Sequence, residues 1–474
     1  MIDFEFEEWL TPEDAGISSA GLLKFLDEAE RLSGTVQLHS LILLRYGKVV
    51  RRFNWQPYDD RTPHTLYSLS KSFCSAAAGF AVQEGLLSWD TSVVDALPDE
   101  IPEGREDALR PITLRTLLCM GSGLDPASDS APEDDTISWA RHVLSHDVQY
   151  PPMAHFHYNT FGTYLVACMV ERAAGEDLVS YLKPRLFDPL GIQAPNWDRS
   201  PQGVCIGGFG LYLSSDSIAR FGQCLLDHGK WQGIQVLPAD WVILATSGHI
   251  DNSNGHPDPE NEWTQGYGYQ FWRCTEGRYR GDGMYGQVCM VDEKLDMVVA
   301  ATCATKDIAA ELLMFRKYLF PSVDAQPGTV GDQEKLETRI AALGYACPAD
   351  DGTAPEIPEG EYEYDTEWGS TAIVTVSREE DRLCVSFDRL VNFVMGHGEW
   401  LPSVIRVGDG AARWLGAYGA ENGRLTIQFC SPDGPGTLKG TLSWDGRTLT
   451  CDAEGMDCPD GQLVLRPHVD PPED

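Results

Sequence analysis

The sequence predicts an α+β fold followed by a separate all-β domain. Strand-like runs stand near both ends of the first 320 residues, and helical periodicity dominates the stretch between them. After residue 360 the chain has the pattern of about eight short strands separated by turns such as Trp444-Asp445-Gly446. We therefore expect a first domain at 1–322, a linker with a short helix at 323–360 and a β-rich accessory domain at 361–474.

The elements of the first domain are predicted in order. Ser18 caps a helix whose leucines recur at helical spacing. Strands at 38–45 and 48–55 form a hairpin around Tyr46-Gly47, where glycine supplies the positive φ that such turns require. A helix rich in small residues spans 70–84. Further helices are expected at 113–120, 136–145, 160–174, 216–228, 238–247 and 308–319, with strands at 266–273, 286–292 and 297–302.

Composition and charge exclude several classes of function. The 474 residues are 42% hydrophobic and 23% charged, which is typical of a folded globular protein. Lys and Arg number 36 against 72 Asp and Glu, a formal charge of −36 that repels anions, so nucleic acid and anionic membrane are excluded as partners. The sequence does not specify an oligomeric state.

The chain carries no targeting signal that we can identify. Its first residues include neither a basic region nor an apolar run, and no later stretch approaches the ~20 apolar residues of a membrane helix. The 13 cysteines are scattered and form no Cys-x-x-Cys pair, a pattern that favours reduced thiols over disulfides or zinc. We expect a cytoplasmic protein.

The strongest chemical signal is Ser68-Leu69-Ser70-Lys71. A serine hydroxyl is a weak nucleophile until a base takes its proton, and a lysine at i+3 lies on the same helix face as that serine. Burial would lower the pKa of Lys71 so that its neutral amine could be the base near pH 7. Ser68 also stands at a helix N-terminus, where developing negative charge is stabilised.

A second Ser-x-x-Lys occurs at Ser180 and Lys183, and short motifs do arise by chance. It ends at Pro184 within an ordinary amphipathic helix, and nothing in its surroundings would bury the lysine. We therefore favour Ser68 as the nucleophile.

Several ordered segments resemble the penicillin-recognising serine hydrolases, and most closely the branch of class C β-lactamases, esterases and nylon-oligomer hydrolases. They are LYSLSKSF (66–73), GFAVQEGLL (79–87), ITLRTLLCMGSGL (112–124), FHYNT (156–160), LFDPLGI (186–192), GGFGLY (207–212) and DGMYGQ (282–287). The resemblance implies an antiparallel sheet flanked by helices, as in β-lactamases and transpeptidases. It makes Ser68 the acylated nucleophile, Lys71 its proton partner and Tyr158 the tyrosine that passes a proton to the leaving group. A nearby ammonium is expected to lower the pKa of Tyr158 and to couple it to Lys71.

Two departures from the family pattern concern substrate binding. Thr160 stands where the family often has Asn, with Asn159 one position early. The third motif, usually Lys-Thr-Gly or His-x-Gly, corresponds to Gly281-Asp282-Gly283, so the cation that receives a substrate carboxylate is missing. The backbone N–H groups of Ser68 and Met284 would form the oxyanion hole.

Other patterns fail on inspection. Gly281 to Gly286 fits Gly-x-Gly-x-x-Gly, but a strand and turn follow where a dinucleotide site needs a helix. His155 and His157 lack a third metal ligand, and the acidic stretch 251–262 has its glycine one place early for an EF-hand. We predict no metal and no cofactor.

The expected activity is acyl transfer to Ser68 followed by hydrolysis of a small ester or amide, neutral or cationic. One alternative within the same fold is a true β-lactamase or D-alanyl peptidase. Another, from a different class, is a catalytically silent binding protein, which the altered second and third motifs would permit.

Overall fold

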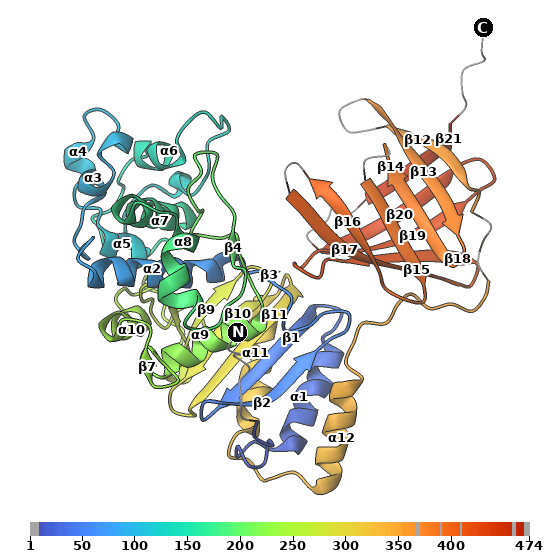
Figure 1. Cartoon of the computed structure of the whole chain (residues 1–474), viewed down its shortest axis with the longest axis horizontal. Coiled ribbons are helices and arrows are strands. Elements are labelled where there is room, and N and C mark those ends of the chain that lie inside the picture. Colours follow the sequence, from blue (N-terminus) through green and yellow to red (C-terminus); the bar gives the residue numbers. More distant parts are fainter. Residues whose placement is uncertain are drawn as a thin grey trace. The chain divides into compact units, whose positions relative to one another are not determined.

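The computed structural model describes residues 9–353, 355, 357–365, 370–388, 391–407, 410–456 and 461–468. These form two compact units (Figure 1). The first contains the described residues up to Asn54 together with Asp59–Ala342, and the second contains Trp55–Tyr58 together with the described residues from Leu343 onward. The structure thus groups the helix after residue 329, which the sequence places in a linker, with the first unit.

The first unit is built on a six-stranded antiparallel sheet. Its order is β2 (Lys48–Asn54), β1 (Val36–Arg45), β11 (Met297–Thr305), β10 (Gln287–Asp292), β9 (Tyr279–Gly283) and β8 (Trp272–Arg273). The first strand pairs with the last long one, as in Leu41 opposite Ala301. β1, β10 and β11 are almost entirely buried, which agrees with their long runs of Val, Leu and Ala and with helices on both faces.

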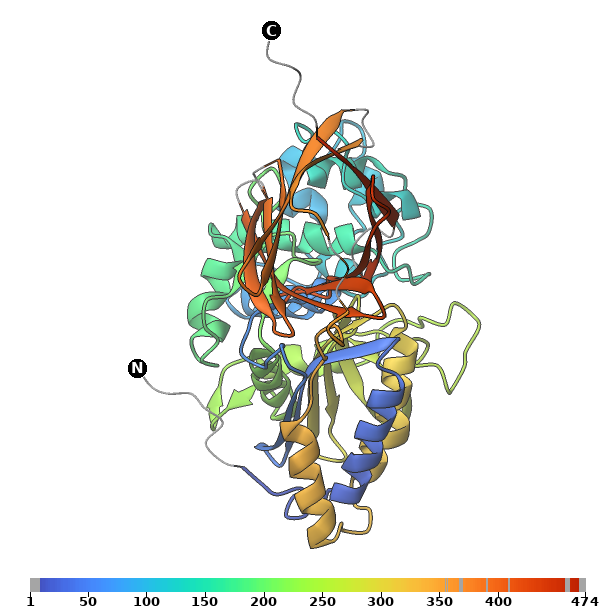
Figure 2. The same cartoon turned by 90° about the vertical axis from the view of Figure 1, so that its right-hand side faces the viewer.

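Helices cover the sheet and form a second, largely helical region. They are α1 (Ser19–Arg31), α2 (Ser70–Gln83), α3 (Val93–Ala96), α4 (Glu106–Leu109), α5 (Leu114–Leu118), α6 (Trp139–Ser145), α7 (Thr160–Ala174), α8 (Leu178–Leu182), α9 (Ser215–Leu226), α10 (Ala239–Thr246), α11 (Ile308–Met314) and α12 (Val330–Ala341). α12 lies beside α1 in two views (Figures 1 and 2), and Arg339 pairs with Asp27 and Glu30 of α1. None of the helices in the described residues is long and apolar enough to cross a membrane.

The small residues of α2 allow it to pack deep inside this unit. Nearly every residue from Ser70 to Ala81 is buried, and α2 packs against α7. A Cβ at Gly79 would lie 2.5 Å from the ring of Trp241 on α10, so only glycine permits this close packing. The Ser72 and Ser75 hydroxyls donate to the carbonyls of Gln270 and Tyr269, so α2 also holds the loop that leads into β8.

The second unit is a ten-stranded antiparallel sheet that curls into a barrel, closed by a parallel pairing of β15 with β17. Its strands are β12 (Gly360–Asp365), β13 (Thr371–Glu379), β14 (Arg382–Phe387), β15 (Val391–His397), β16 (Leu401–Val407), β17 (Gly410–Glu421), β18 (Arg424–Cys430), β19 (Thr437–Trp444), β20 (Leu449–Met456) and β21 (Gly461–Pro467). The segment Trp55–Tyr58 joins this unit, where the Tyr345 N–H donates to the Gln56 carbonyl at 2.7 Å.

The fold class predicted from the sequence is confirmed, and the differences are local. The hairpin around Tyr46-Gly47 forms with both residues at positive φ, and the helix at 160–174 has the expected bounds. The strand expected at 266–273 is wrong except for Trp272–Arg273, because the Tyr269 and Gln270 N–H groups donate to carbonyls at the ends of α10 and α5 rather than to a strand. The barrel has ten strands where the sequence indicated about eight.

Candidate active site

Ser68 lies in a single 3-10 turn, Tyr67–Leu69, that runs directly into α2. Tyr67 has φ of 46°, a left-handed conformation that is costly for a residue with a bulky side chain. Its ring contacts that of Tyr285 edge-on, with centroids 5.2 Å apart. A strained residue immediately before Ser68 fixes the direction of the chain, and Ser68 remains partly exposed.

Lys71 lies one turn further along and is 1% exposed. Its Nζ donates to Ser68 Oγ at 2.9 Å, to the Gly208 carbonyl at 2.8 Å and to Thr160 Oγ1 at 3.3 Å. These three contacts match the three donor positions of an ammonium and hold the amine against the serine oxygen.

Two opposing effects set the charge of Lys71. Burial disfavours the ammonium and lowers the pKa of Lys71 to about 7, although the Asp129 and Asp282 carboxylates act to raise it. A lysine with this pKa is deprotonated in about half of the molecules at neutral pH, so it can accept the serine proton.

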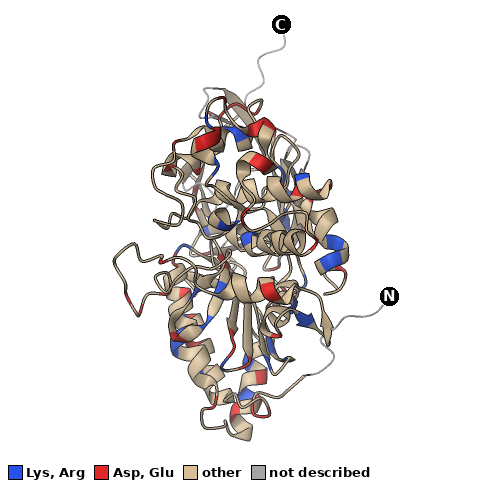
Figure 3. Cartoon of the chain, turned by 90° about the vertical axis from the view of Figure 1, so that its left-hand side faces the viewer, with Lys and Arg blue, Asp and Glu red and all other residues tan. Residues whose placement is uncertain are grey.

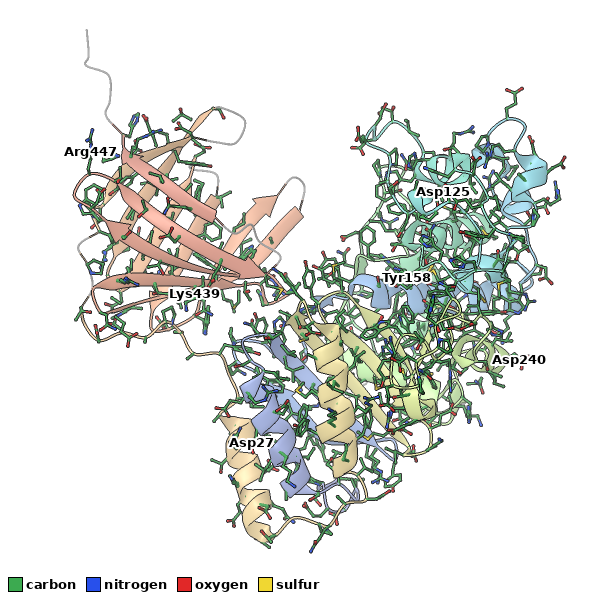
Figure 4. All side chains as sticks on the ribbon, turned by 180° about the vertical axis from the view of Figure 1, so that it is seen from behind. Asp27, Asp125, Tyr158, Asp240, Lys439 and Arg447 are labelled. Atoms are coloured by element: carbon green, nitrogen blue, oxygen red, sulfur yellow. The ribbon has the colours of Figure 1, made fainter. Side chains whose placement is uncertain are left out.

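Tyr158 lies beside this pair and is labelled in Figure 4. Lys71 Nζ stands 4.8 Å from the centroid of the Tyr158 ring. The Ser68 side chain acts to lower the pKa of the Tyr158 phenol. The ring stacks on Trp272 with centroids 5.4 Å apart and planes within 10° of parallel.

The expectation that an ammonium lowers the pKa of Tyr158 is wrong. Burial raises the pKa of Tyr158, and the Asp282 and Asp129 carboxylates raise it further. The lysine nitrogen lies over the ring face, where it is attracted to the π-electrons rather than to a phenolate oxygen. Tyr158 therefore holds its proton at neutral pH, and it is a weak acid that can give this proton up only as it receives another.

The second motif is organised by the N-terminus of α7. Asn159 caps the helix, its Oδ1 accepting from the Gly162 N–H at 2.6 Å, while Thr160 supplies the hydroxyl that contacts Lys71. The Thr160 and Phe161 N–H groups both donate to Asp129 Oδ1, at 2.6 and 3.0 Å. The carboxylate that tunes Lys71 is thus held in place by free donors at a helix N-terminus.

The third motif forms the end of β9, and its two glycines pack against the nucleophile turn. A Cβ at Gly281 would lie 2.5 Å from Ser72 Oγ and 2.6 Å from Leu69 Cδ1, so Gly281 faces α2 and has no room for a side chain. A Cβ at Gly283 would lie 2.2 Å from the Leu66 carbonyl and 3.2 Å from the Ser68 nitrogen. Gly281, which the resemblance places where the family has a cation, therefore has no space for a larger side chain.

Asp282 points to the other side of β9 and is ion-paired. Its carboxylate pairs with Arg280 Nε at 2.8 Å, and the Arg280 side chain is 0% exposed. Arg280 also donates to the Glu262 carbonyl and lies over the ring of Trp263. This arginine offsets only part of the Asp282 charge, since Asp282 still acts to raise the pKa of Lys71 and of Tyr158.

The proposed oxyanion hole lies where β9 ends beside the Ser68 nitrogen. Met284 begins the turn into β10, and Gln287 holds that turn, since its Nε2 donates to the Met284 carbonyl at 3.2 Å and to the Cys303 carbonyl at 2.9 Å. Gln287 is 0% exposed. The Met284 and Ser68 N–H groups stay a predicted pair on neighbouring segments.

Sequence reasoning identified Ser68, Lys71, Tyr158 and Thr160, which the structure brings together. It missed Asp129, Gly208 and Arg280. Paired glycines such as Gly207-Gly208 can mark a close backbone approach, and this pair was a usable signal for Gly208. In the structure, a Cβ at Gly208 would lie 2.6 Å from the Thr160 carbonyl, so the position requires glycine. Asp129 gave no separate signal, since it stands in an acidic loop that looks like ordinary solvated surface.

The second Ser-x-x-Lys has no such surroundings. Ser180 Oγ donates to Asp177 Oδ2 at 2.8 Å, and Lys183 pairs with Asp188 with 60% of its side chain exposed. The two side chains therefore contact separate carboxylates.

The chain is similar to several known proteins. The Beta-lactamase family model matches residues 36–312, more than half of the chain. The 6-aminohexanoate-dimer hydrolase of Paenarthrobacter ureafaciens is 22% identical over 317 residues, which cover 63% of this chain and 80% of that protein.

Two solved structures share the fold. EstCE1, described as a hydrolase with promiscuous acyltransferase activity, is 18% identical with a TM-score of 0.53 and covers 65% of this chain and 99% of its own. The octameric penicillin-binding protein homologue from Pyrococcus abyssi is 16% identical with a TM-score of 0.50 and covers 94% and 99%. The protein therefore belongs to the beta-lactamase family of serine hydrolases.

Proposed function

We propose that the protein hydrolyses a small neutral or cationic ester or amide through an acyl-enzyme on Ser68. One observation carries this proposal: a fully buried lysine whose pKa is lowered to about 7 donates to Ser68 Oγ at 2.9 Å. Burial of an amine costs free energy. An amine held against a serine hydroxyl can act as its general base, and this geometry permits that role.

Each step of the proposed reaction uses a side chain or backbone N–H group of the candidate site. Neutral Lys71 takes the Ser68 proton while Oγ attacks the substrate carbonyl carbon, and the carbonyl π-electrons move to its oxygen. The Ser68 and Met284 N–H groups would stabilise that oxyanion. Tyr158 then gives its proton to the departing oxygen or nitrogen and regains one from the Lys71 ammonium, so the pair ends as it began. Water releases the acyl group by the reverse path.

The preference for neutral or cationic substrates follows from charge. Asp129 and Asp282 both act on the buried amine, and Arg280 is committed to Asp282. The chain as a whole carries −36, with Asp and Glu scattered over many elements (Figure 3). A substrate carboxylate would meet repulsion at both short and long range. The 6-aminohexanoate-dimer hydrolase supports hydrolysis as the reaction type.

Labelling with a fluorophosphonate tests the proposal. The wild-type protein should gain one adduct, located by mass spectrometry on the peptide that contains Ser68. Ser68→Ala should abolish labelling with an unchanged melting temperature, while Ser180→Ala, the matched control, should label at the wild-type rate. An unreactive wild-type protein would favour the catalytically silent binding protein. Rapid turnover of a β-lactam would favour the β-lactamase or D-alanyl peptidase alternative.

We also propose a cytoplasmic location. The twelve cysteines among the described residues are all free, and most are buried, as expected of a chain that folds under reducing conditions. Fractionation of the source cells with an antibody to the protein tests this, and recovery in a membrane or secreted fraction would contradict it.

A further inference from the structure

The barrel of the second unit contains a cavity of about 230 Å³. Its wall is formed by the inward faces of eight strands and presents no polar atom. Six of the lining residues are Val376, Phe387, Phe393, Trp414, Phe429 and Leu463. Two lining residues have a heteroatom in the side chain, Trp414 with its indole N–H and Cys451 with a weakly hydrogen-bonding thiol, and neither presents a polar atom to the cavity.

This space is larger than a packing defect. Protein interiors contain few voids bigger than a water molecule, and an apolar cavity of about 150 Å³ is sufficient to bind benzene. The inward-facing Phe387, Phe393 and Trp414 are only partly buried, although their neighbours Val374 and Leu383 are fully covered. The apolar surface of these rings is therefore available to a molecule inside the barrel.

The aromatic side chains form a continuous wall rather than isolated contacts. The rings of Phe387 and Phe393 meet edge-on with centroids 6.1 Å apart, and Phe393 lies 4.8 Å from Phe429. These three rings come from three strands, β14, β15 and β18. Rings held by neighbouring strands make a rigid surface that suits a flat or chain-like hydrocarbon.

The chemistry of the wall defines the ligand class. A charged or hydrogen-bonding group inside would lose its water and find no partner, so the buried part of the ligand must be alkyl or aryl. The charge of −36 on the chain disfavours an anionic head group as well. By comparison with the benzene-sized case, the volume suits a fused aromatic or an alkyl chain of about eight carbons.

We propose that the barrel is a binding site for a small neutral hydrocarbon-rich molecule, independent of the chemistry at Ser68. The site is formed entirely by described residues of the second unit, and water would not compete for it because the wall offers no hydrogen bonds. Failure of this proposal would leave the proposed hydrolase untouched, and the converse also holds.

Titration of the full chain with 1-aminoanthracene, a neutral fluorescent probe, tests the site. We expect saturable binding to one site with a rise in probe emission, displacement by 1-octanol, and equal binding by Ser68→Ala. Ala453 lines the cavity, so Ala453→Phe should fill it and weaken binding at least about tenfold. Val464 is 43% exposed on the neighbouring strand β21, and Val464→Phe is the matched control that should bind as the wild type does.

A second measurement keeps the test decisive if Ala453→Phe does not fold. Trp414 lines the cavity, so energy transfer from tryptophan to the bound probe should fall in Trp414→Phe while binding persists. Absence of saturable binding to the wild-type protein would overturn the proposal. Equal binding by Ala453→Phe and Val464→Phe, or unchanged energy transfer in Trp414→Phe, would also overturn it by placing the probe elsewhere.

Discussion

Lys71 is the residue whose charge state governs the proposed chemistry. Since the pKa of Lys71 is about 7 and the neutral amine is the reactive form, activity should rise from acid pH with a midpoint near 7. Lys71→Ala should lower kcat by ~10²-fold or more, the scale of a positioned base. Lys71→Arg should not restore it, because a guanidinium stays protonated. Rates of p-nitrophenyl acetate hydrolysis between pH 5 and 9 give the comparison, and a flat profile in the wild type would contradict the role.

Asp129 provides a test of how the pKa of Lys71 is set. Its carboxylate raises the pKa of Lys71, so Asp129→Asn should lower that pKa and move the acid limb of the pH profile to lower pH. The asparagine oxygen can still accept from the Thr160 and Phe161 N–H groups, which limits structural damage. Asp135→Asn changes the same charge at an exposed place in the same loop and should leave the midpoint unmoved. A shift toward higher pH would refute the electrostatic account.

At the scale of residues, the sequence identified what is local and missed what is distant. Ser68 and Lys71 share one helical turn, so their contact follows from spacing alone. Asp129 and Gly208 reach Lys71 from 58 and 137 positions away, and no periodicity links them. The sign of the pKa shift at Tyr158 depends on burial and on the Asp282 carboxylate, neither of which a sequence displays.

Among the elements, α11 carries a buried acid that lies against the turn between β9 and β10. Glu311 is 0% exposed, and neither carboxyl oxygen meets a hydrogen-bond partner. Burial raises the pKa of Glu311 well above its ordinary value, so the folded protein keeps a proton there that the unfolded chain loses above about pH 4.3. The stability of the folded state must therefore fall as pH rises through this range.

Glu311→Gln removes this dependence. We expect the melting temperature to be nearly unchanged at pH 4, below the unfolded pKa, and to rise at pH 8 by about 2 °C or more, the shift that ~1 kcal/mol produces in a domain of this size. Thermal unfolding at the two pH values measures it. Equal effects at both pH values would show that Glu311 is not protonated in the folded protein.

The elements that the sequence predicted well begin and end at clear capping residues. α7 begins at the cap Asn159 and ends at Gly175 with φ of 73°, and both signals are local. The stretch 266–273 alternates like a strand, but its backbone groups pair with helix ends and with the serines of α2. β9 was missed as a strand because Gly281 and Gly283 are chosen for close approach to α2 and the nucleophile turn rather than for strand propensity.

Across the whole molecule, net charge bears on substrate choice. We expect kcat/KM for a short-chain neutral nitrophenyl ester to exceed that for nitrocefin, which carries a carboxylate, by about a hundredfold, equivalent to ~2.7 kcal/mol. Gly281 cannot receive a cation, but Met284 is 57% exposed in the turn that follows β9. Met284→Lys should narrow the gap and Met284→Gln should not. Efficient nitrocefin hydrolysis by the wild-type protein would reverse the preference.

The short segment Trp55–Tyr58 has a consequence for the time course of synthesis. It leaves the ribosome early, yet its main-chain partners, the Leu343 carbonyl and the Tyr345 N–H, follow roughly 290 residues later. At about 5–20 residues per second, that interval is on the order of 15–60 s. The Gln56 N–H and carbonyl must wait through this interval open to water or to chaperones. A chain released before Leu343 would lack those partners altogether, even with every catalytic residue already made.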